Sequence, residues 1–493
     1  MITNLLIGAA LGSAGLPLLT RSARAAVFAS AAGSTLVFIL GAMVGVSAFG
    51  MPGAVVGGLW YLDPLAGLLV FLVTFVGWTA SIAGISYLLV EEHEDVITSS
   101  QVRHYGALSA LFVFSMLVVV LSNNLGLMWV ALEATTLTTV LLVAFYARPG
   151  SLEAAWKYLI LCSTGIALGL MGVMLTYAAA SSGGTSGFAA LSFATLLHAA
   201  PALSPALMRL SFAFILVGFG TKVGLVPMHA WLPDAHSSAP SPISGMLSGI
   251  LLTTALFAII RYKTLVDLAL GGSSFTSSLL LAFGALTTLV SALFILVQTD
   301  YKRLLAYSSI EHMGMSTFAL GLGVPGAFIA VIHLVGHALA KPMLFFGAGN
   351  VLHRFKSTKF ERVEGVARVL PYTAGFFLVG LLALLALPPS PLFMSEYLLA
   401  MQALSTHPLA FIPVALALVI VFAGFARLFF PFLFSRAESS AAAESLETLS
   451  APERVNSAHV AMALHMAALA LVAAALFSGV AFPFIERAAA TII

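Results

Sequence analysis

The chain has 493 residues, of which 60% are hydrophobic and 8% are charged, and its formal net charge at pH 7 is +2. This composition excludes an ordinary soluble protein, and the small net charge, without a basic patch interleaved with aromatics, gives no sign of nucleic-acid binding. The single cysteine, Cys162, excludes intrachain disulfides and cysteine-ligated iron–sulfur clusters.

Apolar runs long enough to cross a hydrocarbon core, about 20 residues each, recur from end to end. The first has no basic flank ahead of it and no small-residue cleavage site, so we expect it to be retained. We predict an all-α polytopic membrane protein, a single membrane domain over residues 1–493, with about fourteen transmembrane helices. The expected spans cover residues 2–20, 25–49, 64–90, 105–122, 124–147, 155–180, 205–228, 242–262, 275–299, 303–323, 325–352, 370–402, 408–433 and 459–484.

Basic residues divide unevenly between the two sides of these spans. Of the 21 Lys and Arg residues, fourteen fall in connections on one side and four on the other, while Lys222, Lys341 and Arg427 lie within spans. Because cytoplasmic loops are enriched in Lys and Arg, we predict that the richer side is cytoplasmic. With an even number of spans, both termini then face outward.

The fifth run contains Glu133 with no flanking charge. A charged group at bilayer depth costs roughly 2.5–3.5 kcal/mol even on insertion scales, so such residues tend to be paired and functional. Lys222, in the seventh run, is its natural partner. At ~4 Å and an effective dielectric of about 20, the pair would be coupled by about 4 kcal/mol. Opening and closing this pair could switch the lysine between holding and releasing a proton; alternatively, the pair is static and fixes helix packing.

Prolines predict that the seventh and twelfth helices are broken. Backbone groups freed by proline are tolerated at membrane depth only where protein buries them or water reaches them. A charge lies beside each break, Lys222 in the seventh run and Glu396 in the twelfth, five runs apart. Transporters with inverted repeats place their sites at broken helices in matching positions. The prolines concerned are Pro227 and Pro233, and Pro388, Pro389 and Pro391.

This positional match divides the membrane domain. We expect N-terminal helices 1–3 at residues 1–104, a first five-helix repeat at 105–262, an inverted second repeat at 275–433 and a last helix at 459–484. Residues 435–457 are rich in Ser, Ala and Glu, and this composition predicts a flexible cytoplasmic linker. This linker either contacts a soluble partner or is a solvated connector.

The segment after the seventh run gathers His229, Asp234 and His236 around two prolines, on the expected cytoplasmic side. Two interpretations remain open. The segment forms a vestibule through which protons are taken up or passed on, or it caps the seventh and eighth helices.

The eleventh run places His333, His337 and Lys341 at successive four-residue steps. This spacing keeps the three side chains on one helix face, and imidazole titrates near neutrality and can pass protons on. We expect a proton relay that ends at the acid Glu396. The alternatives are structural hydrogen bonding and a His-x-x-x-His metal site. With no third carboxylate or thiol ligand evident, we expect no metal.

Two polar residues of the tenth run, Glu311 and His312, are possible connectors, although polar residues that pack helices together are an alternative. No nucleotide-binding glycine loop, thiolate cluster or nucleophile–base pair occurs in the sequence. We therefore expect no cofactor in this chain and no redox chemistry of its own. Energy must come from partner subunits or from an ion gradient.

The segment that begins at Lys222, KVGLVPMHAWLPDAHSSAPSPISG, resembles the signature of the antiporter-like proton-translocating subunits of complex I, membrane-bound hydrogenases and Mrp antiporters. The segments EATTLTTVLLVAFYARPGSLEAAWKYLILCSTGIAL and LPPSPLFMSEYLLA are most similar to hydrogenase-4 component F. The resemblance covers almost the whole chain and implies fourteen helices with inverted five-helix repeats. It also implies a proton path through Glu133, Lys222, His333, His337, Lys341 and Glu396.

The chain departs from this family at the eighth helix, where many relatives carry a lysine or histidine that connects the two half-paths. Thr253 and Ser248 stand at those positions here. Because neither side chain titrates, the central link would need water or hydroxyl relays.

From this resemblance we expect a proton-translocating membrane subunit of a hydrogenase-4-type, complex-I-like redox-driven complex in a bacterial or archaeal cytoplasmic (inner) membrane. The expected partners are the lipid bilayer, other antiporter-like membrane subunits, and soluble redox subunits in which iron–sulfur clusters and a nickel–iron centre are expected. The alternatives are a subunit of an Mrp-like secondary cation/proton antiporter and a structural membrane scaffold with an incomplete proton path.

Overall fold

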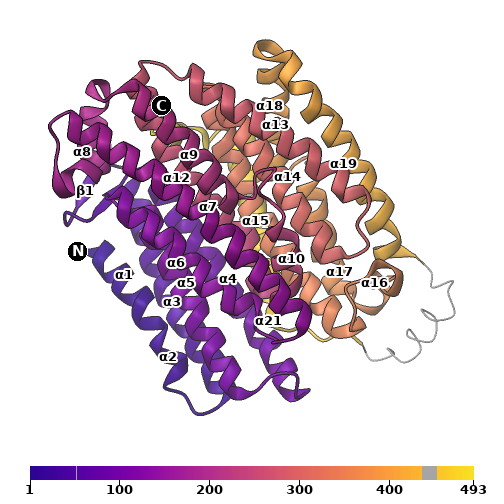
Figure 1. Ribbon diagram of the computed structural model, residues 1–493. Helices are drawn as coiled ribbons and strands as arrows, with labels where there is room; N and C mark the ends of the chain where they lie inside the picture. The colour runs from indigo at the N-terminus through magenta and orange to yellow at the C-terminus, as the bar shows by residue number, and fades with distance from the viewer. Residues whose placement is uncertain (52, 436–451, 493) are drawn as a thin grey trace.

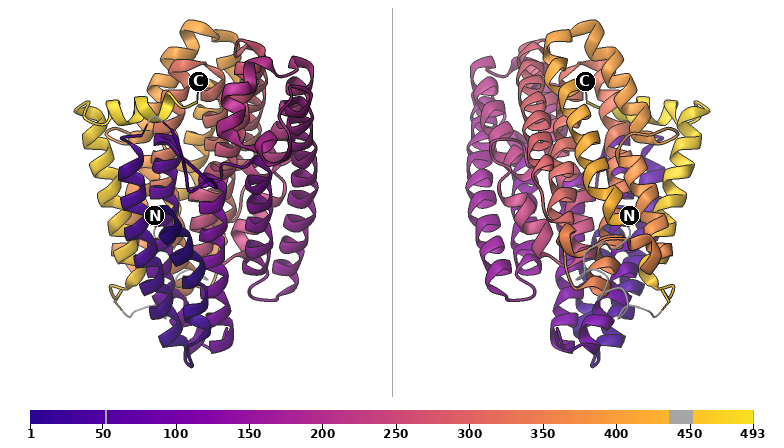
Figure 2. Two further views of the ribbon diagram at one scale, coloured as in Figure 1. Left: turned by 90° about the vertical axis from the view of Figure 1, so that its left-hand side faces the viewer. Right: turned by 90° about the vertical axis from the view of Figure 1, so that its right-hand side faces the viewer.

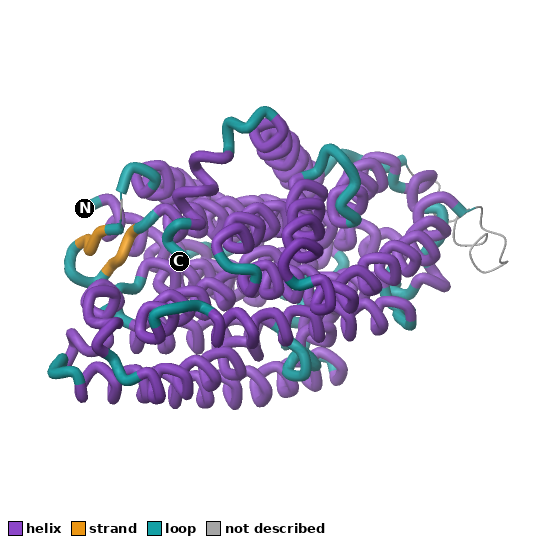
Figure 3. The backbone as a smooth tube through the Cα atoms, turned by 90° about the horizontal axis from the view of Figure 1, so that it is seen from above, coloured by secondary structure: helices purple, strands orange, loops and turns teal. Residues whose placement is uncertain are grey.

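The computed structural model describes residues 1–51, 53–435 and 452–492, and most of them are helical. Long helices run side by side through the bundle (Figure 1). Seen from above, the bundle is elongated, with a pair of strands at one edge (Figure 3). This antiparallel pair, β1 (Ala54–Val56) and β2 (Trp60–Leu62), is the departure from an all-α fold among the described residues.

The helices before the first expected repeat are α1 (Ile2–Ser13), α2 (Gly15–Leu18), α3 (Ala23–Ala48) and α4 (Pro64–His93). The start of α4 shows why a helix begins where it does. Pro64 fixes a helical φ at a position whose N–H would have no partner in the helix, and the Asp63 carboxylate accepts a hydrogen bond from the N–H of Ala66 at 2.8 Å.

The helices of the first expected repeat are α5 (Ser99–Leu121), α6 (Leu125–Val143), α7 (Pro149–Ser182), α8 (Phe193–Ala199), α9 (Pro205–Val223), α10 (Trp231–Ser238), α11 (Ser241–Met246) and α12 (Leu252–Leu270). A π-helical turn, Leu247–Leu251, joins α11 and α12 into one span. The helices that follow are α13 (Ser274–Leu296), α14 (Tyr301–Gly321), α15 (Val324–Phe355), α16 (Val366–Val369), α17 (Pro371–Leu384), α18 (Pro391–Thr406), α19 (Pro408–Phe434), α21 (Ser457–Phe477) and α22 (Phe482–Ala489).

Each of the fourteen expected spans has a helical counterpart among the described residues. Eleven helices there are long and apolar enough to cross a membrane. The other three expected spans correspond to α1 with α2, to α14, and to α17 with α18. α14 is less apolar because it carries Glu311 and His312, and every residue of this helix except Arg303 is buried.

Both predicted helix breaks are present. α9 ends at Val223, the next residue, Gly224, has a φ of +86°, and α10 starts only at Trp231. A residue with a Cβ is strained at positive φ, so glycine suits the point where the chain leaves the helix. α17 ends at Leu384 and α18 begins at Pro391. Each broken helix is the fourth in its set of five, which agrees with the expected repeats.

Two short helices correct the expected boundaries. α8 lies in what was expected to be a connection, and the last expected span, 459–484, is too long because α21 stops at Phe477. α22 follows it and lies across the end of the bundle (Figure 2). Of the expected linker 435–457, residues 436–451 lie outside the described residues.

Two helices form the centre of the bundle. The most apolar window of the α11–α12 span is 100% buried and that of α15 is 94% buried, against 28% for α3 and 33% for α19. α15 carries the three residues of the expected relay. The part of the candidate site that α15 carries, His333, His337 and Lys341, therefore lies where lipid does not reach.

Candidate functional site

Lys222 lies in the last turn of α9, just before the helix breaks, and its side chain is fully buried. The N–H of Gly224 bonds back to the carbonyl oxygens of Gly220 and Thr221. The indole N–H of Trp231 also donates to the carbonyl oxygen of Thr221, at 2.8 Å. The backbone at the break is thus satisfied while the lysine points into the interior, toward α6 and α7.

Lys222 and Glu133 are linked, but the direct ion pair predicted from the sequence is wrong. The hydroxyl of Thr136 lies between the Lys222 ammonium and the Glu133 carboxylate. The Lys222 ammonium donates to Thr136 Oγ1 at 2.8 Å, and Thr136 Oγ1 donates to Glu133 Oε2 at 3.0 Å. Thr136 lies one helical turn after Glu133 on α6, which places its hydroxyl on the face that α9 approaches.

Further hydroxyls surround the two charges. Lys222 also donates to the hydroxyl of Tyr158 at 2.7 Å, and that hydroxyl shares a hydrogen bond of 2.6 Å with Thr139. Ser163 donates to the other oxygen of the Glu133 carboxylate at 2.7 Å. Charge-assisted hydrogen bonds of this kind are stronger than those between neutral groups, and they offset part of the cost of burying Lys222 and half-burying Glu133.

The bridging hydroxyl has the geometry of a proton relay. A hydroxyl can accept with a lone pair and donate its own proton at the same time. If the Lys222 ammonium gives a proton to Thr136 while Thr136 gives its proton to Glu133, the lysine and the carboxylate both become neutral and the threonine is unchanged. The reverse transfer restores the ion pair.

A second lysine, Lys341, lies on α15, where the next residue is Pro342. Its ammonium donates to the carbonyl oxygen of Leu305 at 2.7 Å and to the hydroxyl of Ser308, both on α14. The carboxylate of Glu311 on the same helix is its electrostatic partner. Lys341 is therefore held against α14 in the same way that Lys222 is held against α6.

A histidine pair lies beyond Lys341. Nδ1 of His312 and Nε2 of His333 are 3.0 Å apart, and Nδ1 of His333 is 2.9 Å from the hydroxyl of Ser395 on α18. The ring of His337 lies 5.5 Å from that of His312, centroid to centroid. The predicted common face of His333, His337 and Lys341 is therefore present, and it faces α14.

The carboxylate of Glu396 completes this cluster from the broken helix. One ligand atom from each of His312, His333 and Glu396 lies within 4.8 Å of the other two. Two imidazoles and a carboxylate could hold a zinc ion. Spacing along the chain did not indicate this set of ligands, because Glu396 comes from α18, 63 positions after His333. The expected absence of a metal stays a prediction.

Two members of the cluster have buried polar atoms without a hydrogen-bond partner among the described residues. These atoms are both carboxylate oxygens of Glu311 and both ring nitrogens of His337. Oε2 of Glu311 is 3.6 Å from Nε2 of His312. Buried polar groups are nearly always hydrogen-bonded, often to internal water. We therefore expect water molecules in this cluster.

The central link contains hydroxyls rather than charges. Ser248, in the π-helical turn, shares a hydrogen bond of 2.7 Å with Ser309 on α14. Thr253 instead donates to the carbonyl oxygen of Gly249 in its own helix, at 3.2 Å. Of the two positions expected at the central link, Ser248 is thus the one connected to α14.

The residues expected around the first break divide into two roles. Asp234 forms ion pairs with Lys157, at 3.2 Å, and with Arg303, and so ties α10 to α7 and α14. His236 is fully buried, with Nδ1 2.9 Å from the carbonyl oxygen of Leu232. His229 lies in the break between α9 and α10. Asp234 thus cross-links helices, whereas His236 is buried in the interior.

Sequence reasoning missed the neutral partners of the charges: Thr136, Tyr158, Ser163, Ser308 and Ser395. Thr136 carried one usable signal, because it lies three positions after Glu133 and residues at that spacing meet on a helix surface. The others come from different helices, and hydroxyl residues are common in helices for many reasons.

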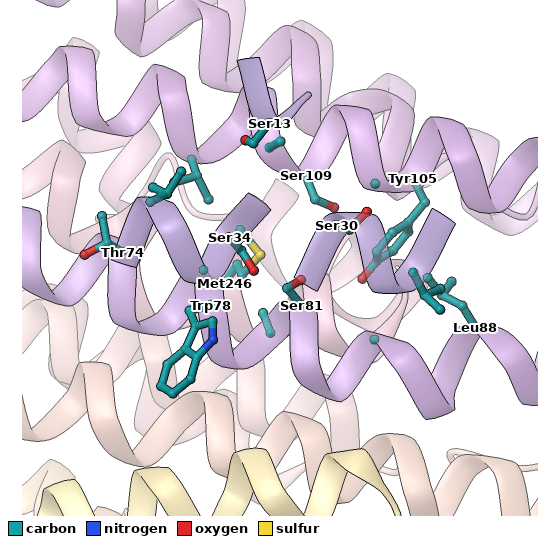
Figure 4. A pocket seen from close by; sticks show the side chains of 18 of the residues that line it. Ser13, Ser30, Ser34, Thr74, Trp78, Ser81, Leu88, Tyr105, Ser109 and Met246 are labelled. Atoms are coloured by element: carbon teal, nitrogen blue, oxygen red, sulfur yellow. The ribbon is translucent and has the colours of Figure 1, made fainter. Parts of the chain in front are cut away.

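A separate cavity of about 50 Å³ lies among α1, α3, α4, α5 and α11 (Figure 4). Hydroxyls point into it from several of these helices, including Ser30, Ser34 and Ser81 (Figure 4). None of its described lining residues is an acid, a lysine, an arginine or a histidine. It is therefore not part of the charged path.

The chain is similar to proteins of one membrane family. The family described as NADH:quinone oxidoreductase/Mrp antiporter, transmembrane, matches residues 122–422. A hydrogenase-4 component F homolog of Methylacidiphilum infernorum is 39% identical over 364 residues, or 74% of this chain and 76% of that protein. Hydrogenase-4 component B of Escherichia coli is 30% identical over 68% of this chain, which spans 49% of that protein. NADH-quinone oxidoreductase subunit N of Desulforudis audaxviator is 32% identical over 72% of this chain and 68% of that protein.

Two solved structures share the fold. A chain of the membrane-bound sulfane sulfur reductase, an archaeal respiratory membrane complex, aligns with a TM-score of 0.85 at 24% identity, covering 100% of this chain and 97% of that one. A chain of the Mrp complex from Dietzia sp. aligns with a TM-score of 0.82 at 19% identity, with the same coverage. At these identities the likeness concerns the fold alone.

Proposed function

We propose that this chain, which belongs to the NADH:quinone oxidoreductase/Mrp antiporter transmembrane family, is a proton-translocating membrane subunit. Its complex is of the hydrogenase-4 type, resembles complex I and is driven by redox chemistry. The relatives named as hydrogenase-4 components and as a complex-I-type subunit support this assignment. The chain supplies the membrane path, and other subunits supply the electron transfer.

The observation that carries the proposal is the hydrogen-bonded series Lys222–Thr136–Glu133, in which the lysine and the threonine are fully buried and the glutamate is half-buried. A lysine and a glutamate are held at opposite ends of one hydroxyl, inside a bundle, next to a helix break. A purely structural ion pair needs direct contact to recover the cost of burying two charges. The hydroxyl-bridged arrangement recovers less of that cost and provides a path between the two charges.

The second cluster supplies the other half of the path. The series follows α15 from Lys341 through His337 to His333. There it meets His312 of α14 and Glu396 of the second broken helix. The hydroxyl pair of Ser248 and Ser309 supports a central connection through hydroxyls and water. Protons would thus move through this chain with no group in it changing its oxidation state.

The proposal extends to location and partners. The richer basic side faces the cytoplasm of a bacterial or archaeal cell, and both termini face outward. The partners are other antiporter-like membrane subunits and soluble redox subunits that carry iron–sulfur clusters and a nickel–iron centre. The multisubunit membrane complexes among the structural neighbours support the membrane partners.

The test is purification of the intact complex and identification of its companions, followed by reconstitution into proteoliposomes driven by the electron donor that those companions indicate. We expect proton movement that an uncoupler abolishes and that Lys222→Ala lowers by at least about tenfold, because proton-transfer groups typically contribute 10²–10⁴-fold to a rate. Unchanged proton movement with Lys222→Ala in an assembled complex would support a structural scaffold instead.

A secondary antiporter is the second candidate, favoured by the full-length fold match to a chain of an Mrp complex. In that case the purified complex contains no redox subunit. Proton movement then follows an imposed sodium gradient and not an electron donor.

A further inference from the structure

A cavity of about 730 Å³ opens at the basic end of the bundle, where α4 meets helices of both sets of five. Its rim is exposed: the side chains of Lys356, Lys359 and Glu94 are 59%, 52% and 39% accessible. Its wall comes from α4, the connection between α6 and α7, the end of α10, the start of α14 and the end of α15. The cavity thus reaches from the surface to residues that are almost completely buried.

One wall of the cavity holds a buried acid. Glu91 is 5% exposed. Its Oε1 accepts a hydrogen bond from the Tyr146 hydroxyl at 2.7 Å and lies 3.4 Å from Nε2 of His353. The Tyr146 hydroxyl is also 2.8 Å from that of Tyr87. The second oxygen, Oε2, is buried and has no partner among the described residues, so it is free to bind a proton or a water molecule.

A buried base lies at the floor. Lys302, at the start of α14, is 1% exposed and lines the same cavity. Its ammonium donates to the carbonyl oxygen of Ala239 at 2.8 Å, and the carboxylates of Glu91 and Asp300 act on it electrostatically. A buried ammonium with a single neutral partner is costly unless water or a carboxylate reaches it. The cavity supplies the water.

The floor adjoins the second cluster. His236 interacts electrostatically with the ammonium groups of both Lys302 and Lys341. His337 in turn interacts electrostatically with His236. The Nε2 atom of His236 is buried and has no hydrogen-bond partner among the described residues. Lys341 bonds to the carbonyl oxygen of Leu305, one helical turn from Lys302 on α14.

We propose that this cavity is the cytoplasmic proton-uptake vestibule of the second cluster, with Glu91 as the acceptor at its wall and Lys302 and His236 as the groups that pass the proton inward. The proposal rests on the function proposed above. It names the surface from which protons enter the second cluster. Of the three residues for which the sequence left a vestibule and a structural role open, it places His236 in the path and Asp234 in helix cross-linking.

The transfer balances in protons. A hydronium ion or buffer acid of the cytoplasm gives up a proton, which passes through cavity water to the free oxygen of Glu91 and leaves water or the conjugate base of the buffer in the cytoplasm. Glu91 then passes that proton through cavity water to Lys302 when the lysine is neutral. Lys302 passes a proton to Nε2 of His236, and His236 returns to its starting form as it passes a proton to Lys341. No bond other than those to hydrogen is made or broken.

The first experiment measures whether water reaches the cavity. Ser238 lines it and is half-buried, and Cys162, the natural cysteine of the chain, is buried. In vesicles that contain the intact complex, we expect a membrane-impermeant maleimide to label Ser238→Cys from the cytoplasmic face only. Labelling is read by mass spectrometry on peptides of this chain. An unlabelled Ser238→Cys, or labelling from the opposite face, overturns the proposal.

The second experiment measures proton movement by the reconstituted complex. We expect Glu91→Gln to lower the rate about tenfold, since proton-transfer groups contribute 10²–10⁴-fold and water replaces part of this, and Glu91→Asp to retain most of it. Glu92→Gln is the matched control: it makes the same change one residue away, outside the cavity, and its partner Ser99 can still donate to the amide oxygen. Equal rates for Glu91→Gln, Glu92→Gln and wild type overturn the vestibule.

The outcomes separate the two proposals. If wild type moves protons, Lys222→Ala does not and Glu91→Gln does, the proposed function stands and the vestibule is wrong. If wild type moves no protons in a complex that transfers electrons normally, both proposals fall.

Discussion

A hydroxyl between an acid and a base changes what the pair can do. Coulomb attraction falls with distance, so Glu133 and Lys222 hold each other less tightly across Thr136 than they would in direct contact. The weaker hold lowers the energy needed to neutralise both groups, while the hydroxyl keeps a continuous hydrogen-bonded path between them. At the scale of single residues this combination favours a switch over a static pair.

Removing the hydroxyl alone tests this interpretation. Thr136→Val keeps the shape of the side chain but leaves the ammonium and the carboxylate without their common partner. We expect it to lower proton movement by the intact complex at least about tenfold, because a positioned proton-transfer group is worth 10²–10⁴-fold. Thr136→Ser keeps the hydroxyl and should stay within a few-fold of wild type. Equal rates for the two variants would show that the hydroxyl is not on the path.

At the scale of elements, two broken helices carry the chemistry. The break in α9 depends on Gly224, whose φ of +86° ends the helix directly after Lys222. A Cβ at Gly224 would also meet Cδ1 of Leu232 at 2.7 Å. The place of the lysine is therefore set by backbone conformation as well as by its hydrogen bonds.

We expect Gly224→Ala to destabilise the break by about 1–2 kcal/mol, the cost of a left-handed conformation for a residue with a Cβ. Amide hydrogen exchange in peptides that span α9 and α10 should become faster, roughly five- to thirtyfold. Gly272→Ala is the control, because a Cβ there meets nothing within 4 Å and Gly272 does not have a positive φ. Equal exchange in both variants would contradict the role given to Gly224.

A carboxylate outside the membrane joins two further elements. Glu453 accepts hydrogen bonds from the N–H groups of Tyr372 and Thr373 at the start of α17 and lies 2.9 Å from Nε2 of His459 on α21. Burial alone would raise the pKa of Glu453, but the hydrogen bonds from His459, Thr373 and Tyr372 lower it overall. Folding therefore favours the charged carboxylate, which holds the start of α21 against α17.

The lowered pKa of Glu453 determines how the stability of this contact changes with pH. Because the folded-state pKa lies below the unfolded value of about 4.3, the stabilisation is complete above that value and is lost as pH falls through the folded-state pKa. We expect Glu453→Gln to speed amide exchange at the start of α17 at pH 7, by an amount typical of a lost helix cap, about 0.5–2 kcal/mol. The difference from wild type should vanish at pH values below the folded-state pKa. A difference that does not change with pH would contradict this account.

At the scale of the whole molecule, the bundle has two chemically different ends. Figure 1 places both chain termini at the end that carries β1 and α8, away from α16. The basic residues gather at the end with α16, where the 730 Å³ cavity opens. Positive charge predicts that this end is cytoplasmic.

Side-specific labelling tests this orientation. A membrane-impermeant maleimide should label Thr358→Cys only from the cytoplasmic side of oriented vesicles and Ser273→Cys only from the outer side. Buried Cys162 should remain unlabelled until the protein is unfolded. Reversed labelling of the two positions would invert the orientation and overturn the cytoplasmic vestibule.

The sequence predicted the charged residues and the helix breaks, which are energetically unfavourable in a membrane. It did not predict the hydroxyl residues, which any membrane helix tolerates. Glu133, Lys222 and Lys341 could be recognised because a charge in an apolar run is costly and needs an explanation. The breaks could be recognised because proline disrupts helices. Thr136 and Ser395 could not, because a serine or threonine costs little in any helix and its partner lies on another one. The direct Glu133–Lys222 pair was wrong for the same reason, since distance between helices is not encoded in the spacing along one of them.

The protonation of Glu133 during turnover is the most direct test that protons move through this chain. Infrared difference spectroscopy of the intact complex, with Glu133→Gln to assign the band, follows the C=O stretch of the protonated carboxyl group. The account predicts that this band appears and disappears as the complex turns over, and that Lys222→Ala abolishes the change. A Glu133 carboxylate that stays ionised throughout turnover in a complex that translocates protons would contradict it.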